Sequence, residues 1–136
     1  MRYDITAAKL KQDGTRPLHA GDDYNYSFTL YDSAGNPLDL TDVTIWFTIK
    51  RSQTDADASA LLQLTSSDGI AIDTAPETGK FVVRFAAADT ATLRGMWWYD
   101  LQVKGTIDGE SGKVVTPLWG QIEFGPNITQ ATAVAP

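Results

Sequence analysis

The stretch from Asp32 to Lys50, DSAGNPLDLTDVTIWFTIK, decides the fold because it joins a crowded turn to a strand of alternating residues. Its first half collects Asp, Ser, Gly, Asn and Pro, which are the residues that tight turns favour. In its second half one face carries Val43, Ile45, Phe47 and Ile49, and the other carries Thr44, Trp46, Thr48 and Lys50. Alternation with a period of two predicts a half-buried strand. The turn is therefore scaffold, and Trp46 lies on the face opposite the core.

The same alternation recurs on both sides of this strand. We expect one core from the apolar phase of the other strands, which comprises Tyr24, Tyr26, Phe28, Leu30, Leu62, Leu64, Phe81, Val83, Phe85, Trp97, Tyr99, Leu101, Val103, Leu118, Ile122 and Phe124. Turn signals such as SSDG, APETG, DGESG and GPN separate these runs. Short alternating strands that are punctuated in this way predict an all-β antiparallel sandwich or barrel.

Two segments interrupt the alternation. The segment AAADTATL, Ala86 to Leu93, predicts a single helical turn that crosses between strands, with Asp89 capping a following turn and Leu93 packed inward. The segment from Asp55 to Leu64 predicts a loop followed by a strand, with a short helix as the alternative. Both segments are compatible with a sheet-dominated fold.

Length and charge narrow the classes of function. The chain has 136 residues and a formal net charge of −6, and its 11 basic residues are scattered. Nucleic-acid binders gather Lys and Arg on one face, so we expect no nucleic-acid partner. No run of about 18 apolar residues occurs, so we expect no membrane partner. We expect a single β-sandwich domain over residues 1–128 and a flexible C-terminal tail over residues 129–136.

The candidate catalytic and metal-binding residues lack the neighbouring residues that such chemistry requires. The chain has no cysteine, which excludes a thiolate zinc site and a disulfide framework. His19 lies near Asp22 and Asp23, but no Ser or Cys stands in a nucleophile motif. Asp108 and Glu110 share one turn, without the apolar wall that raises a carboxyl pKa for general acid catalysis. We therefore predict no enzyme activity, no cofactor and no metal site.

The placement of the aromatic residues gives the stronger functional signal. Trp46 and Trp98 fall on the polar phase of strands whose opposite phase already supplies a core. Trp119 is out of phase with its apolar neighbours, although Pro117 can mark a bulge that resets the register. Either the N-terminal segment or cross-strand neighbours cover these rings, or the rings form a contact surface, where Trp and Tyr are enriched. The interface candidates are these three tryptophans and Tyr31.

Three segments also carry a resemblance: FTLYDSAGNPLDLTDVTIWFTIK, GKFVVRFAAADTATLRGMWWYDLQV and VVTPLWGQIEFGPNIT. From about Asp22 to Thr129 the chain resembles small phage and prophage structural domains related to the N-terminal domain of phage upper baseplate proteins. The resemblance implies an immunoglobulin-like sandwich with no catalytic residues. It also implies a non-enzymatic virion structural protein of a tail, baseplate or fibre attachment, assembled in the host cytoplasm. Such a protein forms an oligomer with itself or with other phage structural proteins.

A carbohydrate- or host-surface-binding module on the same sandwich is the rival hypothesis. In that case an exposed tryptophan, Trp98 or Trp46, stacks on a sugar ring while Asp and Asn side chains hydrogen-bond its hydroxyls. The two hypotheses differ in the shape of the surface that they require. A sugar site needs a shallow groove with an aromatic residue flanked by polar groups, whereas a subunit interface is broad and flat.

Overall fold

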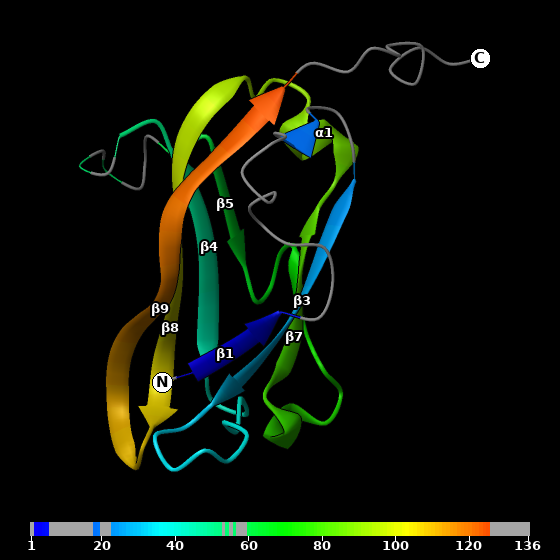
Figure 1. The fold of residues 1–136 in the computed structure, drawn as a ribbon. Helices are drawn as coiled ribbons and strands as arrows, with labels where there is room; N and C mark the ends of the chain where they lie inside the picture. Colours follow the sequence, from blue (N-terminus) through cyan, green and yellow to red (C-terminus); the bar gives the residue numbers. More distant parts are fainter. Residues whose placement is uncertain are drawn as a thin grey trace.

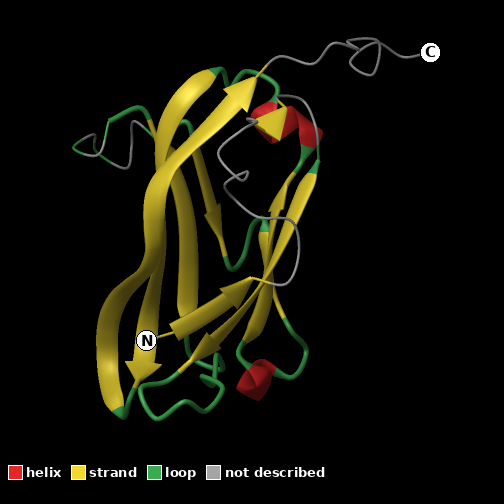
Figure 2. Cartoon of the chain, viewed as in Figure 1, coloured by secondary structure: helices red, strands yellow, loops and turns green. Residues whose placement is uncertain are grey.

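The computed structural model describes residues 2–5, 18–19, 23–52, 54, 56 and 60–125, with side chains from Asp23 onward (Figure 1). The strands are β1 (Arg2–Ile5), β2 (Leu18–His19), β3 (Tyr24–Tyr31), β4 (Thr44–Lys50), β5 (Leu62–Thr65), β6 (Ile70–Ile72), β7 (Lys80–Phe85), β8 (Gly95–Ile107) and β9 (Glu110–Gly125). The helical segments of these residues are the 3-10 turn η2 (Pro76–Thr78) and α1 (Ala87–Thr90), which are short (Figure 2). No helix in the described ranges has the length and apolar character needed to cross a membrane.

The strands form two sheets that pack face to face (Figure 1). The four-stranded sheet has the order β1-β3-β7-β6, and the five-stranded sheet has the order β2-β9-β8-β4-β5. All neighbours are antiparallel except β2, which runs parallel to β9. With the usual letters for immunoglobulin strands, these are the ABED and GFC orders, with β5 added beside C and β2 added beside G. The predicted immunoglobulin-like antiparallel sandwich is confirmed.

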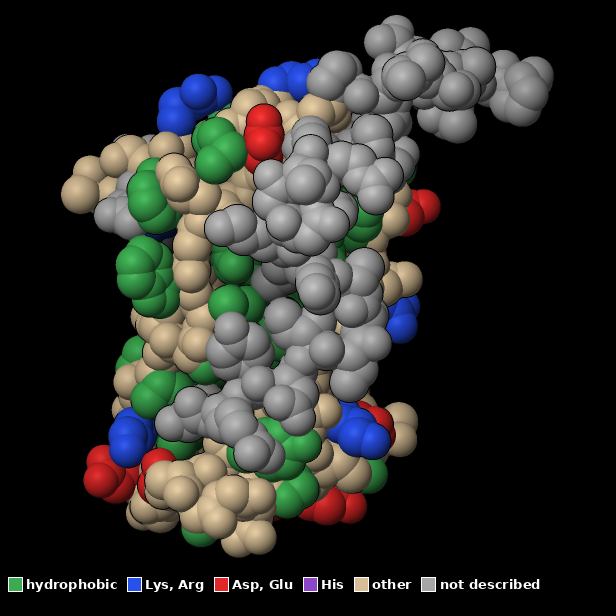
Figure 3. Space-filling model, in the orientation of Figure 1, with side chains coloured by type: hydrophobic (Ala, Val, Ile, Leu, Met, Phe, Trp, Pro, Cys, Tyr) green, Lys and Arg blue, Asp and Glu red, His purple; other side chains and the backbone are tan. Residues whose placement is uncertain are grey.

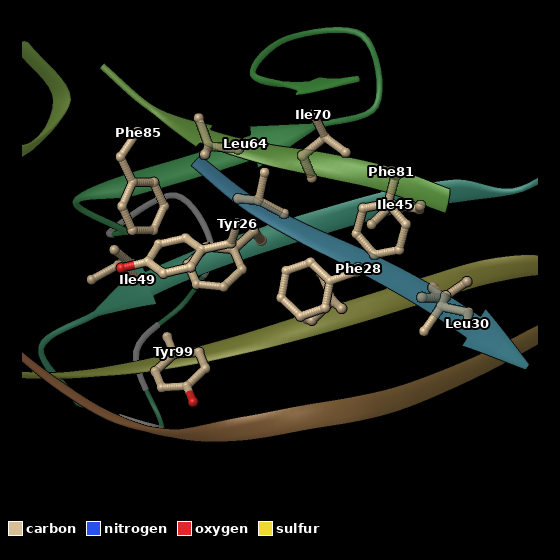
Figure 4. Close-up of a cluster of buried hydrophobic side chains, with 14 of the residues drawn as sticks. Tyr26, Phe28, Leu30, Ile45, Ile49, Leu64, Ile70, Phe81, Phe85 and Tyr99 are labelled. Atoms are coloured by element: carbon tan, nitrogen blue, oxygen red, sulfur yellow. The ribbon is translucent and has the colours of Figure 1, made fainter. Parts of the chain in front are cut away.

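Aromatic rings from both sheets fill the space between the layers (Figure 4). Phe28 and Phe81 stack with their centroids 5.1 Å apart, and Tyr26 meets the Phe85 ring edge-on at 5.6 Å. Phe47 joins the sheets, because its ring lies 5.3 Å from that of Phe85 on the opposite sheet. The predicted core is therefore confirmed for Phe28, Phe47, Phe81, Val83, Phe85, Tyr99 and Leu101, which are all buried.

The turn between β3 and β4 is held by its own polar residues. The Asp32 carboxylate accepts hydrogen bonds from the backbone N–H groups of Ala34 and Asn36, at 3.0 and 2.9 Å. After the turn, Leu38 and Leu40 are buried at the end of the sandwich. The prediction that this turn is scaffold is consistent with these contacts, because the bonds to Asp32 close the turn on itself.

The helical turn α1 occurs where the sequence predicts it, and Leu93 packs inward with 1% exposure. The capping role predicted for Asp89 is wrong in its direction. The Asp89 carboxylate accepts a hydrogen bond from the N–H of Ala86, at 3.0 Å, and so caps the start of its own turn. The Asp23 carboxylate accepts from the next N–H, that of Ala87, which ties this turn to the start of β3.

The long hairpin of β8 and β9 is more extended than the alternation predicts. Its turn is Asp108-Gly109, with φ of 54° and 80°, the pattern of a two-residue hairpin turn of type I′. Leu101 pairs with Leu118 and Val103 with Val115, so two residues of β9, Thr116 and Pro117, oppose one of β8. The bulge suggested by Pro117 is therefore confirmed. Beyond it the register runs unbroken from Leu118 to Phe124, so alternation alone places Trp119 on the outer face.

Other predictions meet the structure only in part. β5 confirms a strand at the end of the segment from Asp55 to Leu64, while residues 53, 55 and 57–59 lie outside the described residues. β6 was not predicted, because three residues are too few to show a period of two. The tail predicted for residues 129–136 also lies outside the described residues, whose last is Gly125.

Candidate functional site

The candidate site lies on the outer face of the five-stranded sheet. The inner phase of β4 and β8 fills the core, so the alternate side chains of both strands point away from it. Strand register then fixes their neighbours. Across β4 and β8, Trp46 pairs with Gln102, and Lys50 pairs with Trp98. The two tryptophans therefore stand on neighbouring strands, with the polar pair of Thr48 and Asp100 between them.

The third tryptophan joins them from β9. Trp119 pairs with Asp100, which is two residues from Trp98 on β8. The diagonal between neighbouring antiparallel strands places Trp119 and Trp98 roughly 7–8 Å apart at their Cα atoms. Trp98 lies opposite Lys50, which is four residues along β4 from Trp46. The two tryptophans are therefore roughly 14 Å apart. The tryptophans thus form a triangle around a polar centre at Asp100.

A groove of about 590 Å³ runs over this triangle. Its lining, which we call the tryptophan groove, comprises Trp46, Thr48, Lys50, Gln63, Trp98, Tyr99, Asp100, Gln102, Thr116 and Trp119. The volume falls in the range of about 300–1,000 Å³ that small-molecule sites occupy. In the view of Figure 3, apolar side chains stand out along the side of the molecule formed by β8 and β9, and charged side chains lie at both ends of that side.

The rings differ in how far they project. Trp119 is 65% exposed, whereas Trp46 and Trp98 are half-buried between their cross-strand neighbours. Sequence reasoning therefore named all three tryptophans of the groove. Tyr31, the other interface candidate, lies at the end of β3 in the four-stranded sheet and is not among the residues that line the groove.

Sequence reasoning placed Thr48 and Lys50 on the outer face with Trp46, but it named none of the polar residues of the groove as a site residue. Gln63 on β5 donates a hydrogen bond from Nε2 to Oγ1 of Thr48, at 3.1 Å, which holds both side chains against the groove floor. Asp100 and Lys50 bring one negative and one positive charge to the same lining. The signal that could have found these residues is their phase, because each alternates with a buried residue of its strand, as the tryptophans do.

The fourth tryptophan has a different role. Trp97 is 2% exposed and points into the sandwich, where its indole N–H donates to the backbone oxygen of Arg94 at 3.0 Å. The Arg51 guanidinium lies 4.3 Å from the centroid of the Trp97 ring, which is cation–π distance. Trp97 is therefore structural and does not take part in the groove.

Asp108, one member of the acidic pair that the sequence raised as a catalytic possibility, has structural partners. The N–H and the hydroxyl of Ser33 both donate to the Asp108 carboxylate, each at 2.9 Å. These bonds lower the pKa of Asp108, and Lys113 at 3.7 Å adds to the effect. Within the described residues no three His, Cys, Asp or Glu side chains gather as a metal site. The side chain of His19 lies outside the described residues.

No family model matches this chain, and no curated protein matches it. Among solved structures, it is similar to AggA, the major subunit of aggregative adherence fimbriae type I from Escherichia coli. That similarity has a TM-score of 0.35 and 10% sequence identity, and it covers 93% of this chain and 97% of AggA. A likeness this distant does not bear on function.

Proposed function

We propose that the chain is a non-enzymatic structural domain of a phage virion, a building block of its tail, baseplate or fibre attachment. In this role it assembles with other copies or with other virion proteins. Its location is the virion, which is assembled in the host cytoplasm. The proposal draws on the resemblance of the three sequence segments to phage structural domains. The observation that carries it is the exposed face on which Trp46, Trp98 and Trp119 stand together.

Exposure of these tryptophan rings to water is unfavourable, and binding of a partner would relieve it. The inner phases of the two sheets already complete a core, so the fold does not need tryptophans on the outer phase. Tryptophan is enriched where proteins meet their partners, and it dominates the energy of many contacts. We therefore assign the contact surface of the domain to the tryptophan groove.

Sedimentation of the purified chain over a wide range of concentration tests the assembly role. The same measurement is repeated with structural proteins that neighbouring genes encode. Trp46→Glu and Trp98→Glu place a charge on the face without touching the core, so both variants should fold and lose the complex. Val114→Ala is the matched control, because Val114 is 50% exposed on β9 and does not line the groove. A parent chain that is strictly monomeric and binds no such protein, with variants that behave alike, refutes the assembly role.

A carbohydrate- or host-surface-binding module is the second candidate, and the shape of the groove favours it. A subunit interface of ordinary size buries roughly 800 Å² on each partner over a fairly flat patch. The tryptophan groove is instead concave, and six of its ten lining residues are Thr, Lys, Gln or Asp. This module can belong to the same virion, because a particle also contacts its host.

A further inference from the structure

We propose that the tryptophan groove binds a neutral oligosaccharide, a short chain of linked pyranose rings without phosphate, sulfate or carboxylate groups. The inference rests on the proposed function in one respect, namely that this groove is the contact surface of the domain. It adds the chemical class of the occupant. Four features of the groove point to this class: its alternation of rings and polar groups, its balanced charge, its shape and its rigidity.

The lining alternates aromatic rings with hydrogen-bonding groups. Along β8, Trp98 is followed on the same face by the carboxylate of Asp100 and the amide of Gln102. Across the sheet, Asp100 lies between Trp119 and Thr48. A pyranose has the matching alternation, because its C–H face is apolar and its rim carries hydroxyl groups. An indole can cover the C–H face while carboxylate, amide and hydroxyl groups bind the rim.

The charges of the groove favour an uncharged ligand. Lys50 and Asp100 contribute opposite charges, so the lining has no net charge. The chain as a whole carries a formal net charge of −6, which repels a polyanion at long range. A phosphorylated or sulfated polymer needs clustered Lys and Arg, and the groove offers a single Lys. The occupant is therefore a neutral sugar and not an anionic one.

The shape of the groove suits a chain of sugars better than a protein surface. The most distant tryptophans, Trp46 and Trp98, stand roughly 14 Å apart along the strands, which is long enough for more than one ring to lie between them. Trp119 sits beside the polar centre with 65% of its surface exposed, so one face of its ring is available for stacking. The core of a protein interface is depleted of charged residues, whereas this floor contains Lys50 and Asp100.

The groove is also rigid before any ligand arrives. Its residues stand on β4, β5, β8 and β9, and none comes from a loop. The Gln63–Thr48 hydrogen bond fixes part of the polar floor in advance. A preformed site loses little conformational freedom on binding, which matters for sugars because their hydroxyl groups must be taken from water. Sheet positions are thus the right support for a weak but specific ligand.

The four tryptophans provide the experiment with its own internal control. Each indole N–H gives a separate signal in a ¹⁵N correlation spectrum, and three of the four belong to the groove. The full chain is titrated with neutral oligosaccharides of glucose, galactose, rhamnose and N-acetylglucosamine, and with heparin as the anionic comparison. We expect one neutral series to shift the signals of Trp46, Trp98 and Trp119. Trp97 should stay in place, because its indole is buried and bonded to Arg94.

Variants then connect binding to the rings. Trp119→Ala and Trp98→Ala should each weaken the sugar by about tenfold or more, since each removes a stacking surface. Trp119→Phe, which keeps a ring, should recover part of the loss. Val114→Ala, on the same strand but outside the groove, should bind like the parent. The Trp97 signal also reports folding, so a variant that fails to fold is recognised directly.

The inference is overturned if no neutral series shifts the groove indoles at millimolar concentration, or if heparin binds more tightly than all of them. It is also overturned if the alanine variants bind the sugar like the parent. The chain could bind no sugar but form a complex with a virion protein that Trp98→Glu abolishes. That result refutes saccharide binding and supports the assembly role. A chain that binds sugar but no virion protein does the reverse.

Discussion

Replacing Phe47 with alanine should be among the most destabilising single changes in this chain. Phe47 is fully buried, and its ring lies 5.3 Å from Phe85 and 5.5 Å from Tyr99. Deleting a buried Phe side chain typically costs about 3–5 kcal/mol through lost burial and the cavity left behind. Each aromatic pair adds about 0.5–1.5 kcal/mol, so we expect the upper half of that range. Domains of this kind have about 5–15 kcal/mol of stability in total, so the variant should fold only marginally.

Urea unfolding followed by tryptophan fluorescence measures the effect. The midpoint should fall steeply while the slope m stays near that of the parent, because the surface exposed on unfolding changes little. Phe47→Leu keeps most of the volume and should lose clearly less than Phe47→Ala. Thr44→Ala, on the exposed face of the same strand, should change stability by no more than about 0.5 kcal/mol. A loss below about 1 kcal/mol for Phe47→Ala would show that the two faces of β4 are assigned the wrong way round.

Three further predictions follow from local contacts. Gly105→Ala should cost about 1–3 kcal/mol in a thermal or urea melt, because a Cβ there would lie 2.8 Å from the backbone oxygen of Asp42; an unchanged midpoint would contradict this close approach. Tyr26→Phe should raise stability by about 1 kcal/mol, since the buried hydroxyl has no hydrogen-bond partner in the described residues. Burial also raises the pKa of Tyr26, so stability should fall as the pH rises past the usual Tyr value of about 10, and the Phe variant should lose part of that fall. The hydrogen bonds from Ser33 lower the pKa of Asp108 in the folded chain. This carboxylate therefore stabilises the fold at pH values above its usual pKa of about 3.9. The contribution is lost as the pH falls through the lower pKa of the folded state. Ser33→Ala should flatten that acid dependence in unfolding curves, and an unchanged profile would show that the contact does not matter.

The sequence could predict the two faces of the sandwich because alternation is a local property. Phe47 and Trp46 are neighbours in the chain, and a period of two alone sends one inward and the other outward. The strand β6 was missed for the same reason, since three residues are too short for any period to emerge. The first half of β9, from Glu110 to Thr116, was missed because its side chains are mostly exposed or half-buried and lack a fully apolar phase. Local patterns therefore found the strands with a continuous apolar phase and overlooked the first half of β9 and the short β6, although Ile70 of β6 is buried in the core.

The groove required information that no local pattern holds. Lys50 and Trp98 become neighbours only because β4 pairs with β8 in one particular register. Trp119 enters the same face because β9 pairs with β8 in an unbroken register from Leu118 to Phe124, in which Trp119 lies opposite Asp100. A register shifted by one residue on either side would separate the rings. Sequence reasoning named the tryptophans one by one, but the polar floor between them depends on pairings across many residues of chain.

The separation of the two faces also separates stability from recognition. Phe47 and Leu101 are buried inside the sandwich, while Trp46 and Trp98 on the same two strands line the groove outside it. Trp119, which is 65% exposed, adds little buried surface to the fold despite its size. A large apolar ring on the solvent side of a strand does not pack in the core and contributes little to the stability of the fold. The outer rings can therefore change with the ligand while the sandwich beneath them stays the same, which is the condition under which one structural domain can acquire different contacts.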